Sequence, residues 1–148
     1  MVTEKQMDRW VEGFDSWDVC DQCCGNLFDK LPFATTKAIE WAGREEEFVK
    51  RAGFALMAYI AWHDKKAADE KFAPFFLVIV RESTDARNFV KKAVSWALRG
   101  IGKRSRALNE QAIAAGEEIA QIDAKAARWV ANDALKELRS EAVQKRLR

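Results

Sequence analysis

Hydrophobic residues recur along this chain with the spacing of amphipathic helices. The clearest example runs from Phe89 to Arg106, where apolar and polar positions alternate every three or four residues. Its apolar side comprises Phe89, Val90, Ala93, Val94, Ala97, Leu98 and Ile101. A narrow stripe beside it comprises Lys92, Trp96, Arg99 and Lys103, at i, i+4, i+7 and i+11. This stretch therefore predicts a helix that carries a cationic stripe with one large aromatic residue.

The same periodicity predicts helices along most of the remaining chain. They cover residues 4–12, a segment capped by Ser16, one from Thr35 or Thr36 to about Trp41 or Ala42, residues 45–62 and 71–82, one from Ser105 to Gln121, and one from Asp123 to about Ser140. The basic end after residue 140 is expected to fray.

One run of residues could also be a strand. The segment from Phe75 to Val80 is apolar throughout, but it follows Pro74 and leads to no hairpin turn, so we interpret it as a buried helix. With no other strand signal, the sequence predicts an all-α fold. Its length of 148 residues fits a single domain over residues 1–148.

A short motif recurs at a displacement of 41 residues. The segment from Phe48 to Ala52 (FVKRA) returns as Phe89 to Ala93 (FVKKA), and the same displacement again reaches an apolar pattern at Val130 and Ala134. A period of ~40 residues over paired helices is typical of HEAT-like repeats, which stack into an α-α superhelix, or α-solenoid.

The repeat also places basic residues in equivalent positions. Arg51 and Lys92 correspond in neighbouring repeats, so we expect a row of cations along one concave wall. Between Asp85 and Glu110 there is no acidic residue. The cations in this interval are Arg87, Lys91, Lys92, Arg99, Lys103, Arg104 and Arg106. We interpret this distribution as a surface for a polyanion, although the net charge of the whole chain is only +2. The alternative is a solvated basic face with Trp96 wedged between helices.

Other features of the sequence narrow the range of functions. Cys20, Cys23 and Cys24 lie within five residues, which suits reduced thiols better than a disulfide framework, and the chain offers too few further ligands for a zinc site. We expect no metal and no cofactor. No apolar h-region follows a basic start, so we expect no signal peptide, and the longest apolar runs are about half of a membrane span. We expect a cytoplasmic protein without membrane attachment.

A few residues are candidates for chemistry. Trp17 and Asp21 lie one turn apart on a predicted helix, and a carboxylate there could stabilise a cationic, sugar-like transition state; a salt bridge to Arg51 or Lys92 is the alternative. Trp96 could contact a nucleotide or belong to the core. Arg51 could bind a phosphate or be an ordinary surface arginine. His63 is expected at a helix end, without a catalytic role.

Three motifs resemble those of the DNA alkylation repair family, the HEAT-like alkylpurine DNA glycosylases of the AlkD type. Residues 14–21 (FDSWDVCD) resemble its F-D-x-W-D-x-x-D signature. Trp41 with residues 48–52 resembles a second segment, and residues 91–99 (KKAVSWALR) resemble its K-A-x-x-W-x-L-R segment. The motifs occur in the family's order, and the similarity covers roughly residues 8 to 140.

The resemblance implies a function and a set of roles. Family members excise cationic N3- or N7-alkylated purines from duplex DNA without a metal and without the usual base-flipping pocket. Trp17 and Trp96 would frame the lesion, Asp21 would assist departure of the base, and Arg51 would hold a phosphate. Lys91, Lys92, Arg99, Lys103, Arg104 and Arg106 would bind DNA.

The family pattern also leaves alternatives open. Family members carry further repeats before the Trp17 motif, so we expect a shortened member, and a homodimer could restore a full-length groove. A DNA-binding protein without catalysis and a HEAT-like adaptor for an acidic protein partner are the alternatives.

Overall fold

The computed structural model describes residues 3–12 and 33–147. The helices of this part are α1 (Glu4–Glu12), α3 (Ala34–Ala42), α4 (Glu47–His63), the 3-10 helix η2 (Asp69–Phe72), α5 (Ala73–Glu82), α6 (Asn88–Gly102), α7 (Arg106–Ala120), α8 (Lys125–Leu138) and α9 (Glu141–Arg146). These residues contain no strand. The predicted all-α fold is confirmed, and no helix in the described ranges is long and apolar enough to cross a membrane.

A side-chain cap marks the start of α7. The hydroxyl of Ser105 accepts a hydrogen bond from the Leu108 backbone N–H at 3.1 Å, so the predicted start of α7 is confirmed. Because Ser105 opens this helix, α6 ends at Gly102, four residues before the predicted limit of Arg106. The segment from Phe75 to Val80 is helical as predicted, with a proline in the first turn of α5.

Three details of the predicted helices were wrong. The first turn of α3 begins at Ala34, before the predicted caps at Thr35 or Thr36. Ala124 holds the N-cap position of α8, while the Asp123 carboxylate accepts a hydrogen bond from Arg128 at 3.2 Å. The end of the chain does not fray at residue 140, because the Ser140 hydroxyl accepts a hydrogen bond from the Val143 N–H and caps α9.

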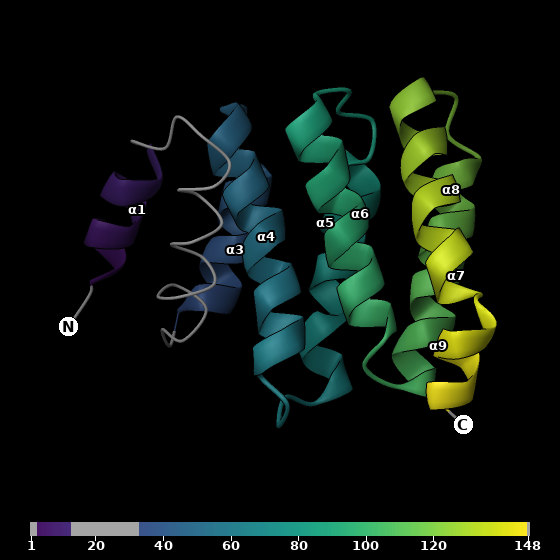
Figure 1. Ribbon diagram of the computed structural model, residues 1–148. Coiled ribbons are helices and arrows are strands. Elements are labelled where there is room, and N and C mark those ends of the chain that lie inside the picture. The colour runs from purple at the N-terminus through teal and green to yellow at the C-terminus, as the bar shows by residue number, and fades with distance from the viewer. Residues whose placement is uncertain (1–2, 13–32, 148) are drawn as a thin grey trace.

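The helices form consecutive pairs that stack along the molecule. Figure 1 shows α1, then the pairs α3/α4, α5/α6 and α7/α8, arranged side by side from the N-terminus to the C-terminus. Short connections join the two helices of each pair, which makes them antiparallel. The second helices, α4, α6 and α8, contact one another in sequence and form what we call the second-helix row; α3, α5 and α7 form the opposite layer. This is a solenoid-like arrangement.

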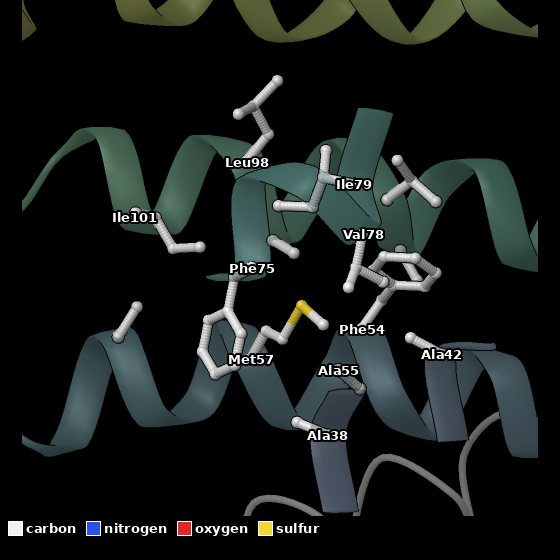
Figure 2. Close-up of a cluster of buried hydrophobic side chains, with 14 of the residues drawn as sticks. Ala38, Ala42, Phe54, Ala55, Met57, Phe75, Val78, Ile79, Leu98 and Ile101 are labelled. Carbon is white, nitrogen blue, oxygen red and sulfur yellow. The ribbon is translucent and has the colours of Figure 1, made fainter. Parts of the chain in front are cut away.

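A continuous apolar core runs between the two layers. Figure 2 shows Phe54 and Met57 of α4 and Phe75 of α5 close together, while Leu98 of α6 points away from them toward the next helices. All four side chains are fully buried. The helix α5 contributes less than predicted, because Leu77 on its outer side is 76% exposed. Each helix pair therefore buries its apolar faces against the next pair, as repeat stacking requires.

The predicted spacing of 41 residues is kept between α4 and α6 but not between α6 and α8. The N-cap positions of α4, α6 and α8 are Glu46, Arg87 and Ala124, which are 41 and then 37 residues apart. The third repeat is thus shorter by about one helical turn. Val130 and Ala134 are nevertheless buried, because a shift of four residues returns a helix to nearly the same face.

Candidate nucleic-acid interface

The predicted stripe of Lys92, Trp96, Arg99 and Lys103 lies along α6, in the second-helix row, with Lys103 at the C-cap of the helix. Lys92 at its start is exposed, Trp96 is partly buried against the core, and Arg99 and Lys103 follow toward the C-terminal end. The periodicity thus identified one face correctly. The alternative that Trp96 is wedged between helices is partly right. Its ring packs edge-on against Tyr59 of α4, with centroids 5.1 Å apart, but it also reaches a surface pocket.

Two cations of the stripe are paired with a carboxylate from the neighbouring helix. Glu137 of α8 accepts hydrogen bonds from Arg99 and from Lys103, each at 3.1 Å. Partial burial would raise the pKa of Glu137, but the bonds from Lys103 and Arg99 outweigh burial and hold the pKa below its ordinary value. Glu137 is therefore ionised at neutral pH, and it offsets part of the positive charge of the stripe.

A second acidic residue of α8 extends this network. Asp133 accepts a hydrogen bond from the buried Ser95 hydroxyl at 2.6 Å, and its carboxylate lies 3.8 Å from the Arg99 guanidinium. Arg99 also donates to the Ser95 hydroxyl at 3.2 Å. The acid-free interval in the sequence did not reveal these carboxylates, because Glu137 and Asp133 come from the next repeat, 38 residues beyond their partners.

Arg51 is not a surface residue. Its side chain is buried, with 8% of the residue exposed, and it donates to the backbone carbonyl of Phe89 at 2.7 Å. The neighbouring Lys50 is also buried and bonds Glu82 at 2.7 Å and Asp85 at 3.2 Å. This pair of residues ties α4 to the start of α6 and to the preceding turn. The predicted phosphate-binding role of Arg51 remains a prediction, whereas its alternative as an ordinary surface arginine is wrong.

The remaining predicted DNA contacts differ in their surroundings. Arg104 donates to the carbonyls of Ala61 at 2.7 Å and Ala67 at 3.1 Å, and its guanidinium stacks on the Phe72 ring at 4.5 Å. It therefore joins α6 to the loop after α4. Lys91 lies over the ring of Trp129 of α8, 4.8 Å from its centroid. Arg106 is largely exposed, with Glu110 at 3.8 Å.

An open pocket of about 720 Å³ lies between the C-terminal halves of α4 and α6. Its lining residues are Ala58, Ala61, Trp62, Lys65, Trp96, Gly100, Lys103, Arg104 and Arg146. The pocket thus combines two indoles with four cationic side chains, and none of the residues that line it is acidic. Such a mixture of aromatic and cationic groups suits a nucleotide or another aromatic anion.

Trp62 is a pocket residue that was not among the predicted site residues. It is 64% exposed at the end of α4 and contributes one of the two indoles of the pocket. The signal was present in the repeat, because Trp62 lies 41 residues before Lys103, the last member of the stripe. Carrying the whole stripe back by one repeat would have identified it.

Several predicted residues lie outside the described residues. Trp17 and Asp21 are among them, so their convergence with Trp96 on one hollow remains a prediction. The three cysteines also fall there. Within residues 3–12 and 33–147, no group of three or more His, Cys, Asp or Glu side chains is arranged to hold a metal ion. His63 is the last residue of α4 and stacks beside Trp62, with ring centroids 4.5 Å apart, which confirms its expected position.

The fold and this face define an all-α, solenoid-like protein with a mixed aromatic and cationic surface. The family model described as "DNA alkylation repair enzyme" matches residues 2–138. The chain belongs to this family, which confirms the family resemblance of the sequence motifs. No curated protein and no solved structure matches the chain.

Proposed function

We propose that this protein binds alkylated duplex DNA along the second-helix row and excises cationic N3- or N7-alkylated purines. The observation that carries the proposal is the position of Trp96, which reaches the cationic pocket beside Lys103 in a member of a DNA alkylation repair family. The exposed Lys92 begins the same stripe, so phosphates could follow it along α6.

The proposed chemistry needs few groups. The bond between the sugar C1′ and the purine nitrogen breaks, its electron pair neutralises the departing cationic base, and the sugar becomes oxocarbenium-like until water adds and releases a proton. In this scheme the Asp21 carboxylate stabilises the sugar cation, and the indoles of Trp17 and Trp96 hold the cationic base by cation–π attraction. Because the alkylated base is already a good leaving group, no metal or cofactor is required.

One observation favours weaker binding of DNA. Glu137 pairs with Arg99 and Lys103, so two of the cations assigned to DNA are partly neutralised in the free protein. That arrangement lowers the attraction of the free protein for DNA. The alternative function is a DNA-binding family member without catalysis. An adaptor for an acidic protein partner would use the same face, and failure to bind any duplex at low salt would favour it.

The decisive measurement is release of free methylated purine from an alkylated duplex. Asp21→Asn should abolish release while leaving DNA affinity equal or higher, because it removes a negative charge near the phosphates. Asp123→Asn, which makes the same change at an exposed loop, is the matched control and should keep full activity. Release by the Asp21 variant at the wild-type rate would show that this role is wrong, and absence of release from the wild type would leave the non-catalytic alternative.

Phosphate contact has its own test. Replacing Lys92 and Lys103 together by alanine should weaken binding evenly across sequences and lower the slope of log K against log salt by about two, since each contact contributes ~0.9. A control that replaces the exposed Arg81 of α5 and Arg139, which pairs with Glu117 of α7 in the opposite layer, should lower the slope less. An unchanged slope in the Lys92 and Lys103 variant would show that the stripe does not touch phosphate.

A further inference from the structure

Trp62 occupies a position that the fold does not require. It is 64% exposed, whereas Trp41 is fully buried, and Leu77 is the other large hydrophobic side chain left exposed in the described ranges. The rings of His63 and Tyr59 lie beside the indole, with centroids 4.5 Å and 6.2 Å away. These rings leave most of the indole exposed, so a flat partner can stack on it.

The floor of the pocket beside Trp62 is made of small residues. Ala58 and Ala61 come from α4, and Gly100 comes from α6. A Cβ built on Gly100 would lie 3.8 Å from Ala58 and Ala61, an ordinary van der Waals contact, so α4 and α6 approach closely at this floor. The volume of about 720 Å³ lies in the ~300–1,000 Å³ range of small-ligand sites and fits one nucleotide, but not a duplex.

Positive charge concentrates on the rim of this pocket. Lys65, Lys103, Arg104 and Arg146 line it, and no carboxylate does. Lys103 is paired with Glu137, and Arg104 is held by backbone carbonyls. In contrast, Lys65 and Arg146 have no ion pair within the described residues, and Arg146 donates to the Lys103 carbonyl at 3.5 Å. These two side chains can therefore turn toward a phosphate without first breaking a salt bridge.

We propose that this pocket receives one unstacked nucleotide of a DNA strand. The base would stack on Trp62 beside the Trp96 indole, and Lys65 and Arg146 would bind its phosphate. The inference rests on the proposed binding of DNA, but it adds a site that the family motifs do not contain, because Trp62, Lys65 and Arg146 lie outside those motifs. A free nucleoside phosphate has the same chemistry, and the experiment separates the two sources.

The test is a fluorescence-anisotropy titration with two labelled duplexes of equal length, one fully paired and one with a single bulged thymidine. Wild-type protein should bind the bulged duplex more tightly. Trp62→Ala should weaken binding of the bulged duplex by roughly fivefold to a hundredfold, as loss of one base-stacking aromatic does, and should leave the paired duplex almost unchanged. Arg146→Ala should lower the salt slope for the bulged duplex by about one.

Two surface variants serve as matched controls. Leu77→Ala removes an exposed apolar side chain from α5, and Arg128→Ala removes an exposed arginine from α8; neither should alter the preference for the bulge. Equal affinity of wild type for both duplexes, or a preference that survives in Trp62→Ala, overturns the inference. Displacement of the bulged duplex by thymidine monophosphate at equimolar concentration overturns it in favour of a free-nucleotide site.

These outcomes are independent of catalysis. No base release is measured with either duplex, so a failed bulge preference leaves the proposed excision of alkylpurines standing. Conversely, a preference that depends on Trp62 stands even where methylated purine is not released from an alkylated duplex.

Discussion

The salt bridges of Glu137 make a quantitative prediction about DNA affinity. Glu137→Gln keeps the shape of the side chain and removes one negative charge from the stripe of α6. Arg99, Lys103 and Glu137 are 28%, 30% and 35% exposed, so these ion pairs are partly screened by solvent. We therefore expect the substitution to reduce the free energy of unfolding by no more than ~1 kcal/mol, the usual limit for such pairs.

The substitution should also raise the affinity of the protein for DNA. A phosphate about 7 Å from the lost charge is repelled by roughly 2 kcal/mol at an effective dielectric of ~20 and by about 0.6 kcal/mol at ~80, and screening over the ~10 Å Debye length at 0.1 M salt roughly halves both values. Glu137→Gln should therefore lower the Kd of a paired duplex about two- to fivefold. The gain should shrink at higher salt, because the Debye length falls.

Anisotropy titrations at two salt concentrations measure this effect. Glu117→Gln is the matched control. It removes one carboxylate from α7, in the opposite layer, together with the pairing of that carboxylate with Arg139. A circular-dichroism melt shows that each variant remains folded. Equal or weaker binding by Glu137→Gln at low salt would refute the reasoning, since it would place the phosphates away from Arg99 and Lys103.

Three further predictions concern stability. Gly53→Ala should lower the free energy of unfolding by about 1–3 kcal/mol or more in denaturant titrations, because its Cβ would lie 2.3 Å from a backbone nitrogen of α3; Gly100→Ala, with neighbours at 3.8 Å, should be neutral or stabilise by roughly 0.5–1 kcal/mol. Burial would raise the pKa of Asp85, but its hydrogen bonds lower it to about 2, so it stabilises the fold above about pH 4 and this contribution is lost as pH falls toward 2. Asp85→Asn should therefore lower stability at pH 7 and flatten the acid limb of melting temperature against pH. Ser105→Ala should cost about 1 kcal/mol in a thermal melt by removing the cap of α7.

The fold could be predicted from the sequence because its causes are local. The 3.6-residue apolar period and the Ser105 cap placed α6 and α7 within a few residues of their observed bounds. The 41-residue displacement gave the stacking of α4 beside α6. Where prediction failed, as at Asp123, a side chain that could cap the helix bonded a nearby arginine instead. Local propensity cannot decide between two such partners.

The site was less predictable because its charge balance is not local. The sequence showed the cations of α6 correctly, but Glu137 reaches them from the next repeat, across the packed helices. In a solenoid each helix of the row meets its neighbour at a displacement of one repeat, so the charge of a face depends on residues about 40 positions away. Counting acids within one segment therefore overstates its positive charge.

Arg51 and Lys92 show how equivalent positions in a repeat acquire different roles. Both lie at corresponding places near the start of a second helix. Arg51 is buried and donates to the Phe89 carbonyl in the first turn of α6, whereas Lys92 is exposed. An equivalent lysine at position 51 could not reproduce the planar fork of the buried guanidinium. The repeat therefore supplies a row of cations, but stacking converts one of them into a tie between helices and leaves the other accessible to a polyanion.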